Sequence, residues 1–163
     1  MSSDNFENLK NILFNDFCQI RKMQCSDKIK IKLLSTLFSA NPNCWRVVGI
    51  TKAALEVFAS HNFQRASGMG VNRSHMHQRS AIYKGMLSMD FADSDDFWDY
   101  YFKHDYTILA TSTENMQDRI IESNAYPVPQ DERMLFRTRG YAWKHGDEEE
   151  YFLIELYKKV SRN

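Results

Sequence analysis

The densest group of side chains that could carry chemistry in this sequence lies in residues 72–79. The segment reads Asn-Arg-Ser-His-Met-His-Gln-Arg, so two histidines stand between two arginines. Side chains of an extended chain alternate between its two faces, and an extended segment therefore places both histidines and both arginines on one face. A neutral imidazole can act as a general base near pH 7, and an arginine can hold a phosphate by paired hydrogen bonds. The pattern predicts two catalytic histidines, His75 and His77, and two phosphate anchors, Arg73 and Arg79.

The same segment lies within a longer stretch that has no acidic residue. No Asp or Glu occurs from residue 57 to residue 89, whereas residues 90–105 are rich in aspartate. Arg65, Gly68 and Gly70 stand within the acid-free stretch, and glycine N–H groups beside cations suit a phosphate or carboxylate. The stretch therefore predicts that these three residues join Arg73 and Arg79 in an anion site. A structural alternative stays open, in which the cations pair with the aspartates that follow them.

A second polar group, Thr111-Ser112-Thr113-Glu114-Asn115, directly follows a predicted strand. Strand ends that lead into helix N-termini often carry binding sites, because the first N–H groups of a helix have no partner within it. We expect Glu114 and His77 to be ligands of a divalent metal, Mg²⁺ or Mn²⁺, and Asn115 to orient a water or a histidine. The alternative is structural, because Thr111 and Glu114 have the Thr-x-x-Glu form of a capping box.

Several well-known catalytic motifs do not occur in the sequence. It has no GxGxxG, GxxxxGK[ST], GxSxG or HExxH pattern and no EF-hand loop. Nucleotide hydrolysis by a P-loop, serine hydrolysis and helical zinc proteolysis are therefore disfavoured.

The elements that position these groups follow from hydrophobic spacing and helix-breaking residues. Apolar residues recur every three or four positions up to residue 20 and again over 26–40, which predicts two packed helices. Further helices are predicted for 52–61, 80–89, 94–104 and 112–123, and the aromatic residues of 94–104 are expected in the core. Strands are predicted near 45–50, 106–110 and 134–143. Residues 148–160 fit both a helix and a strand, so a strand at 150–157 stays open. Basic residues near the strand at 134–143 form another candidate cationic face: Arg133, Arg137 and Arg139.

These elements predict one α+β domain over residues 1–163. It is mostly helical, with a small mixed or antiparallel sheet, and the helical pair in residues 1–40 is expected to pack on it. The length of 163 residues fits one domain, and the 43% hydrophobic and 13% aromatic content supplies a core and argues against disorder.

The chain is expected to be a cytoplasmic protein with no membrane partner. No apolar run approaches the ~20 residues that span a bilayer, and the first residues lack the basic and apolar regions of a signal peptide. Three cysteines, Cys18, Cys25 and Cys44, include no CxxC pair and are expected to be reduced thiols. Because 21 basic residues balance 21 acidic ones, repulsion between copies is weak, and a homodimer is an expected partner state.

Three functions are compatible with these patterns. The leading hypothesis is a nucleic-acid-processing protein, a metal-dependent nuclease in which His75 is the base and Arg73 and Arg79 anchor phosphate. The first alternative is a non-enzymatic, dimeric interaction or accessory domain whose cations face an acidic partner. The second alternative is a binder of a small anionic ligand. The sequence leaves open whether the protein is an enzyme.

Overall fold

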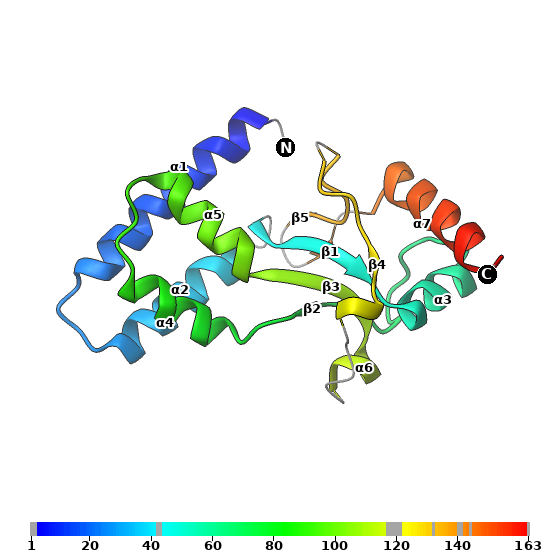
Figure 1. The fold of residues 1–163 in the computed structure, drawn as a ribbon, viewed down its shortest axis with the longest axis horizontal. Helices are drawn as coiled ribbons and strands as arrows, with labels where there is room; N and C mark the ends of the chain where they lie inside the picture. Colours follow the sequence, from blue (N-terminus) through cyan, green and yellow to red (C-terminus); the bar gives the residue numbers. More distant parts are fainter. Residues whose placement is uncertain are drawn as a thin grey trace. The chain divides into compact units, whose positions relative to one another are not determined.

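The computed structural model describes residues 3–41, 44–116, 122–131, 133–139, 142–143 and 145–162. The chain divides into two compact units (Figure 1). The helical unit comprises Met1–Asn41 and His77–Asp105, and the sheet unit comprises Pro42–Met76 and Tyr106–Asn163. Helices and a four-stranded mixed sheet together confirm the predicted α+β class. That residues 1–163 form one domain stays a prediction.

The helical unit contains four long helices, α1 (Ser3–Lys22), α2 (Asp27–Ala40), α4 (Arg79–Ser88) and α5 (Ser94–His104). In its core α1 packs on α2 and α5, and α2 packs on α4. Three aromatic side chains of α5 are buried in the core, as the sequence predicted: Phe97, Trp98 and Tyr101. Phe38 of α2 stacks on Tyr101 with 4.5 Å between ring centroids, and the indole N–H of Trp98 donates to the Lys10 carbonyl oxygen at 3.1 Å. This hydrogen bond allows the indole to be buried, because its N–H group keeps an acceptor.

The sheet unit contains the strands β1 (Arg46–Ile50), β2 (Val71–His75), β3 (Tyr106–Thr111) and β4 (Tyr126–Pro127). Their order is β2-β3-β1-β4, in which β1 and β3 are parallel and the two outer strands are antiparallel to their neighbours. Apolar residues of one sheet face share a core with the helices α3 (Lys52–Ser60) and α7 (Asp147–Val160), which lie side by side in Figure 1. The core residues include Val47, Ile50, Phe58, Leu109 and Leu153.

Residues 148–160, which the sequence left open between strand and helix, form the helix α7. Four acidic residues in its first turn and two lysines in its last turn complement the helix dipole. Glu149 is fully buried, and its carboxylate accepts the backbone N–H groups of Gly146 at 2.8 Å and Phe136 at 3.3 Å. This cap favours the helix, because the Glu149 carboxylate gives the backbone N–H of Gly146, directly before α7, a partner.

Some predicted elements differ from the observed ones. The extended region 134–143 contains two short antiparallel strands, β5 (Thr138–Arg139) and β6 (Ala142–Trp143), and not one strand. The predicted helix at 112–123 is a short helix, α6 (Ser112–Met116), and a 3-10 turn at Glu122–Asn124, whereas residues 117–121 lie outside the described part of the chain. Strands β2 and β4 were not predicted, because β2 is mostly polar and β4 is only two residues long.

Among the described residues, no helix is both long enough and apolar enough to cross a membrane.

Candidate anion-binding site

The segment at 72–79 is extended only as far as His75, where β2 ends. The backbone N–H of Met76 still donates to the Tyr106 carbonyl oxygen at 3.2 Å, and α4 then begins at Arg79. An extended segment 72–79 would place all four side chains on one strand face, but His77 and Arg79 do not lie on it, since the chain leaves the sheet before reaching them. Arg73 and His75 remain together on one face of β2.

Arg73 and His75 meet the indole ring of Trp45, which directly precedes β1. The guanidinium carbon of Arg73 lies 4.6 Å from the Trp45 ring centroid, within the range of a cation–π contact. The ring of His75 approaches the indole edge-on, with 4.7 Å between centroids and 75° between planes. Strand pairing positions Arg73 and His75 for these contacts, because Arg73 lies opposite Leu109 and His75 lies opposite Thr107 on β3. We name Trp45, Arg65, Arg73 and His75 the Arg–Trp–His cluster.

The electrostatic environment of Arg73 disfavours its positive charge. Burial, together with the nearby charge of Arg65, lowers the pKa of Arg73 to about 10, so its guanidinium is still a cation at neutral pH. A bound anion would favour the charged form. Perturbed charges of this kind are typical of functional sites.

A second pair of arginines lies near the start of β1. Burial lowers the pKa of Arg46 and the pKa of Arg137, and the charge of Arg46 lowers the pKa of Arg137 further. Arg133 makes a different contact, because its guanidinium pairs with the Asp131 carboxylate, with Nε 2.9 Å from Oδ2. The side chain of Arg139 lies outside the described residues. Within the described part of the predicted cationic face near 134–143, Arg137 lies near another arginine, Arg46.

The glycines of the acid-free stretch form the turn before β2. Gly68 and Gly70 have φ values of +76° and +73°, a backbone conformation that favours glycine. The Gly70 carbonyl oxygen accepts the backbone N–H of Ser112 at 2.7 Å and the Ser112 hydroxyl at 3.0 Å. The turn therefore holds the start of α6 through Gly70. A role for Gly68 and Gly70 as N–H donors to an anion stays a prediction.

Glu114 forms the capping box that the sequence offered as the structural alternative. Its Oε2 atom accepts the backbone N–H and the hydroxyl of Thr111, both at 2.9 Å. The same oxygen accepts the hydroxyl of Thr51 at 2.9 Å, which joins the ends of the parallel strands β1 and β3. Asn115 is exposed on α6. Within the described ranges, no group of three or more His, Cys, Asp or Glu side chains is placed to hold a metal, so the roles of Glu114, His77 and Asn115 at a metal stay predictions.

Arg79 contacts groups of the helical unit. Its Nε atom lies 3.5 Å from Oδ2 of Asp105, whose side chain is 1% exposed, and its Nη1 donates to the Ser39 hydroxyl at 3.1 Å. The guanidinium also lies 5.4 Å from the ring centroid of Tyr83. These contacts support the structural alternative at Arg79, where the cation pairs with a following aspartate. His77 is exposed in the same unit.

Sequence reasoning missed Trp45 and Arg46 as members of a cationic site. Only their adjacency at the start of the strand predicted near 45–50 distinguished them, and that signal has no specificity.

No protein-family model matches the sequence, no curated protein matches it, and no solved structure matches its fold.

Proposed function

We propose that the sheet unit binds nucleic acid through the Arg–Trp–His cluster. The observation that carries this proposal is the position of the Arg73 guanidinium on the Trp45 ring, 4.6 Å from its centroid, with the His75 ring at the edge of the same indole. Proteins that bind single strands combine cations for the phosphates with aromatic rings for the bases. Single-stranded DNA is therefore the first ligand to test.

The charge distribution of the unit supports the same ligand class. Arg65 adds an exposed cation near Arg73, and Arg46 and Arg137 add two partly buried ones. Several cations in one unit can attract several phosphates at once, which makes a polyanion a more favourable ligand than a monoanion.

Cleavage of the bound strand is a further hypothesis, in which His75 is the base and Mg²⁺ or Mn²⁺ is the metal. The geometry favours binding over cleavage, because the His75 ring packs against an indole and Oε2 of Glu114 already accepts three hydrogen bonds. A homodimer and a cytoplasmic location stay predictions as well.

The direct test is fluorescence anisotropy with a labelled single-stranded DNA oligonucleotide. Arg73→Met should weaken binding about tenfold, the effect of losing one charge-assisted contact. Arg65→Ala should weaken binding by less, because Arg65 is exposed and screened by solvent. Lys52→Met is the matched control, since Lys52 is an exposed cation of the same unit on α3 and should leave affinity unchanged.

Two results would overturn the proposal. The first is that wild-type protein does not bind the oligonucleotide at low salt. The second is that Arg73→Met and Lys52→Met have the same affinity as wild type, which would place any binding elsewhere. Inorganic phosphate and a mononucleotide are titrated separately by calorimetry, and saturable binding of either one without binding of the oligonucleotide would support the small-anion alternative instead.

A further inference from the structure

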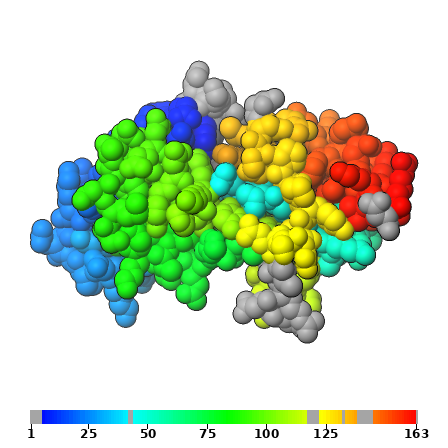
Figure 2. Space-filling model, in the orientation of Figure 1, coloured from blue at the N-terminus to red at the C-terminus, as the bar shows by residue number. Residues whose placement is uncertain are grey.

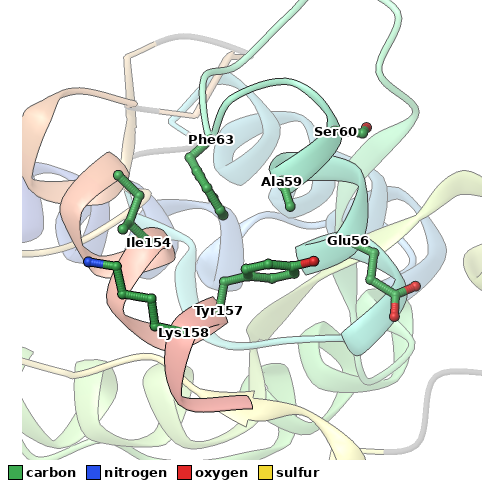
Figure 3. Close-up of a pocket in the computed structure, with 7 residues that line it drawn as sticks. All are labelled: Glu56, Ala59, Ser60, Phe63, Ile154, Tyr157 and Lys158. Carbon is green, nitrogen blue, oxygen red and sulfur yellow. The ribbon is translucent and has the colours of Figure 1, made fainter. Parts of the chain in front are cut away.

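A hollow of about 470 Å³ lies between α3 and α7 of the sheet unit (Figure 3). Its α3 side is formed by Glu56, Ala59, Ser60 and the following Phe63, and its α7 side by Ile154, Tyr157 and Lys158. In Figure 2 the outer surfaces of α3 and α7 adjoin on the face in view. The surface is thus an open groove between two helices, with apolar side chains between its two charged sides.

Local contacts fix the apolar part of this groove. The imidazole Nε2 of His145 donates to the Phe63 carbonyl oxygen at 2.7 Å, which ties the turn after α3 to the start of α7. The Phe63 ring packs edge-on against Tyr157, with 5.5 Å between centroids. The groove therefore exists before any partner binds, and a partner need not order it.

One face of α7 extends the groove along the helix. Tyr151, Ile154 and Lys158 are three and four residues apart, so they lie on one side of the helix. The neighbouring stripe, which includes Phe152, Leu153 and Leu156, packs in the core. Tyr151 is 66% exposed, which is unusual for an aromatic side chain on a packed helix and typical of contact surfaces.

The charged groups of the groove lie on opposite sides. In Figure 3 the Lys158 ammonium lies beyond Ile154 and the Glu56 carboxylate lies on the far side of the Tyr157 ring. Each charge has a partner on its own helix: Lys158 contacts Glu155 at 2.8 Å, and Glu56 contacts Lys52 at 3.9 Å. These exposed pairs contribute little to stability, so both groups can exchange partners.

We propose that this groove binds a second copy of the chain in a two-fold symmetric dimer. A two-fold interface brings one surface onto itself, so it needs a surface that is complementary to itself. A base on one side and an acid on the other meet this need, because Lys158 of each copy then faces Glu56 of the other copy while the Tyr151 rings cover the apolar centre. The zero net charge of the chain adds no repulsion between copies. This inference does not rest on nucleic-acid binding.

The size of the surface sets the strength of the dimer. The residues that line the groove are fewer than the roughly 20–30 per side of a standard interface, so the dimer should be weak and depend on protein concentration. Sedimentation velocity over a concentration series measures this association directly. The wild-type protein should shift from monomer to dimer as its concentration rises.

Variants that exchange the charges of Glu56 and Lys158 test whether the dimer uses this groove. Glu56→Lys and Lys158→Glu should each weaken the dimer by about tenfold or more, because each places like charges opposite one another. The double variant should recover the wild-type dimer, since the exchanged charges again face opposite ones. Lys159→Glu is the matched control, because Lys159 is exposed on α7 and does not line the groove, and it should associate like wild type. All positions changed are exposed or partly exposed, and circular dichroism verifies that each variant is folded.

The proposal is overturned if the wild-type chain stays monomeric at every concentration. It is also overturned if a wild-type dimer forms but the single and double exchanges leave it unchanged, because the dimer then uses another surface.

Discussion

The guanidinium of Arg73 lies on the indole ring of Trp45, at 4.6 Å from the ring centroid, and the pairing of β2 with β3 sets the position of Arg73. Arg73 adjoins a buried strand, since Leu109, directly opposite it on β3, is fully buried. The cation is consequently held in one orientation before a ligand arrives. Preorganisation of this kind lowers the entropy that binding must overcome.

Replacing Arg73 should separate stability from binding. Arg73→Met keeps an apolar stem that can still pack on the Trp45 ring but loses the cation–π contact, so we expect the free energy of unfolding to fall by no more than about 1 kcal/mol. Urea denaturation measures this value. If Arg73→Met instead lowers the free energy of unfolding by more than about 2 kcal/mol, Arg73 has a structural role.

Arg79→Met should have a larger effect on stability. The variant leaves the buried carboxylate of Asp105 without its cation, and breaking a buried ion pair costs about 3–5 kcal/mol. Adding Asp105→Asn should recover part of the loss, whereas Lys84→Met, an exposed change on the same helix, should be neutral. If Arg79→Met instead keeps full stability and weakens DNA binding, the structural interpretation of Arg79 is wrong.

Features that depend on residues close together in the sequence could be predicted, and features that depend on distant residues could not. The capping box of Thr111 and Glu114 and the buried aromatic face of α5 were predicted, because both depend on residues a few positions apart. The contact between Trp45 and Arg73 was not, because it depends on β2 pairing with β3, and no spacing in the sequence encodes that register. The extended part of residues 72–79 ends at His75 for a local reason, since α4 begins at Arg79, one residue before the helix predicted at 80–89.

The Tyr106 hydroxyl should lose its proton at a higher pH than an ordinary tyrosine does. Burial and the hydrogen bond from its hydroxyl to Glu122, 2.8 Å long, raise the pKa of Tyr106 from its usual 10.0. The folded state thus holds this proton more tightly, so the stability from the bond is complete below pH 10 and is lost as pH rises through the raised pKa. Glu122→Gln should lower the pKa of Tyr106 towards 10. NMR titration of labelled tyrosine measures it, and an unchanged pKa in the variant would refute this cause.

The nuclease hypothesis has its own readout. It predicts that wild-type protein nicks a supercoiled plasmid when Mg²⁺ or Mn²⁺ is present, that a chelator stops the reaction, and that His75→Ala abolishes it. His77→Ala is the informative comparison, because His77 lies in the helical unit and is exposed. If neither metal supports cleavage by wild type, the hydrolytic role of His75 is wrong and the binding proposal stands unaffected.

The salt dependence of DNA affinity tests the central claim most directly. For single strands, the slope of log K against log salt is about −0.7 for each phosphate that the protein neutralises. We predict that Arg73→Met makes this slope less steep by about 0.7 relative to wild type, while Lys52→Met leaves it unchanged. Identical slopes and affinities for wild type and Arg73→Met would contradict the assignment of the Arg–Trp–His cluster as the phosphate-binding site.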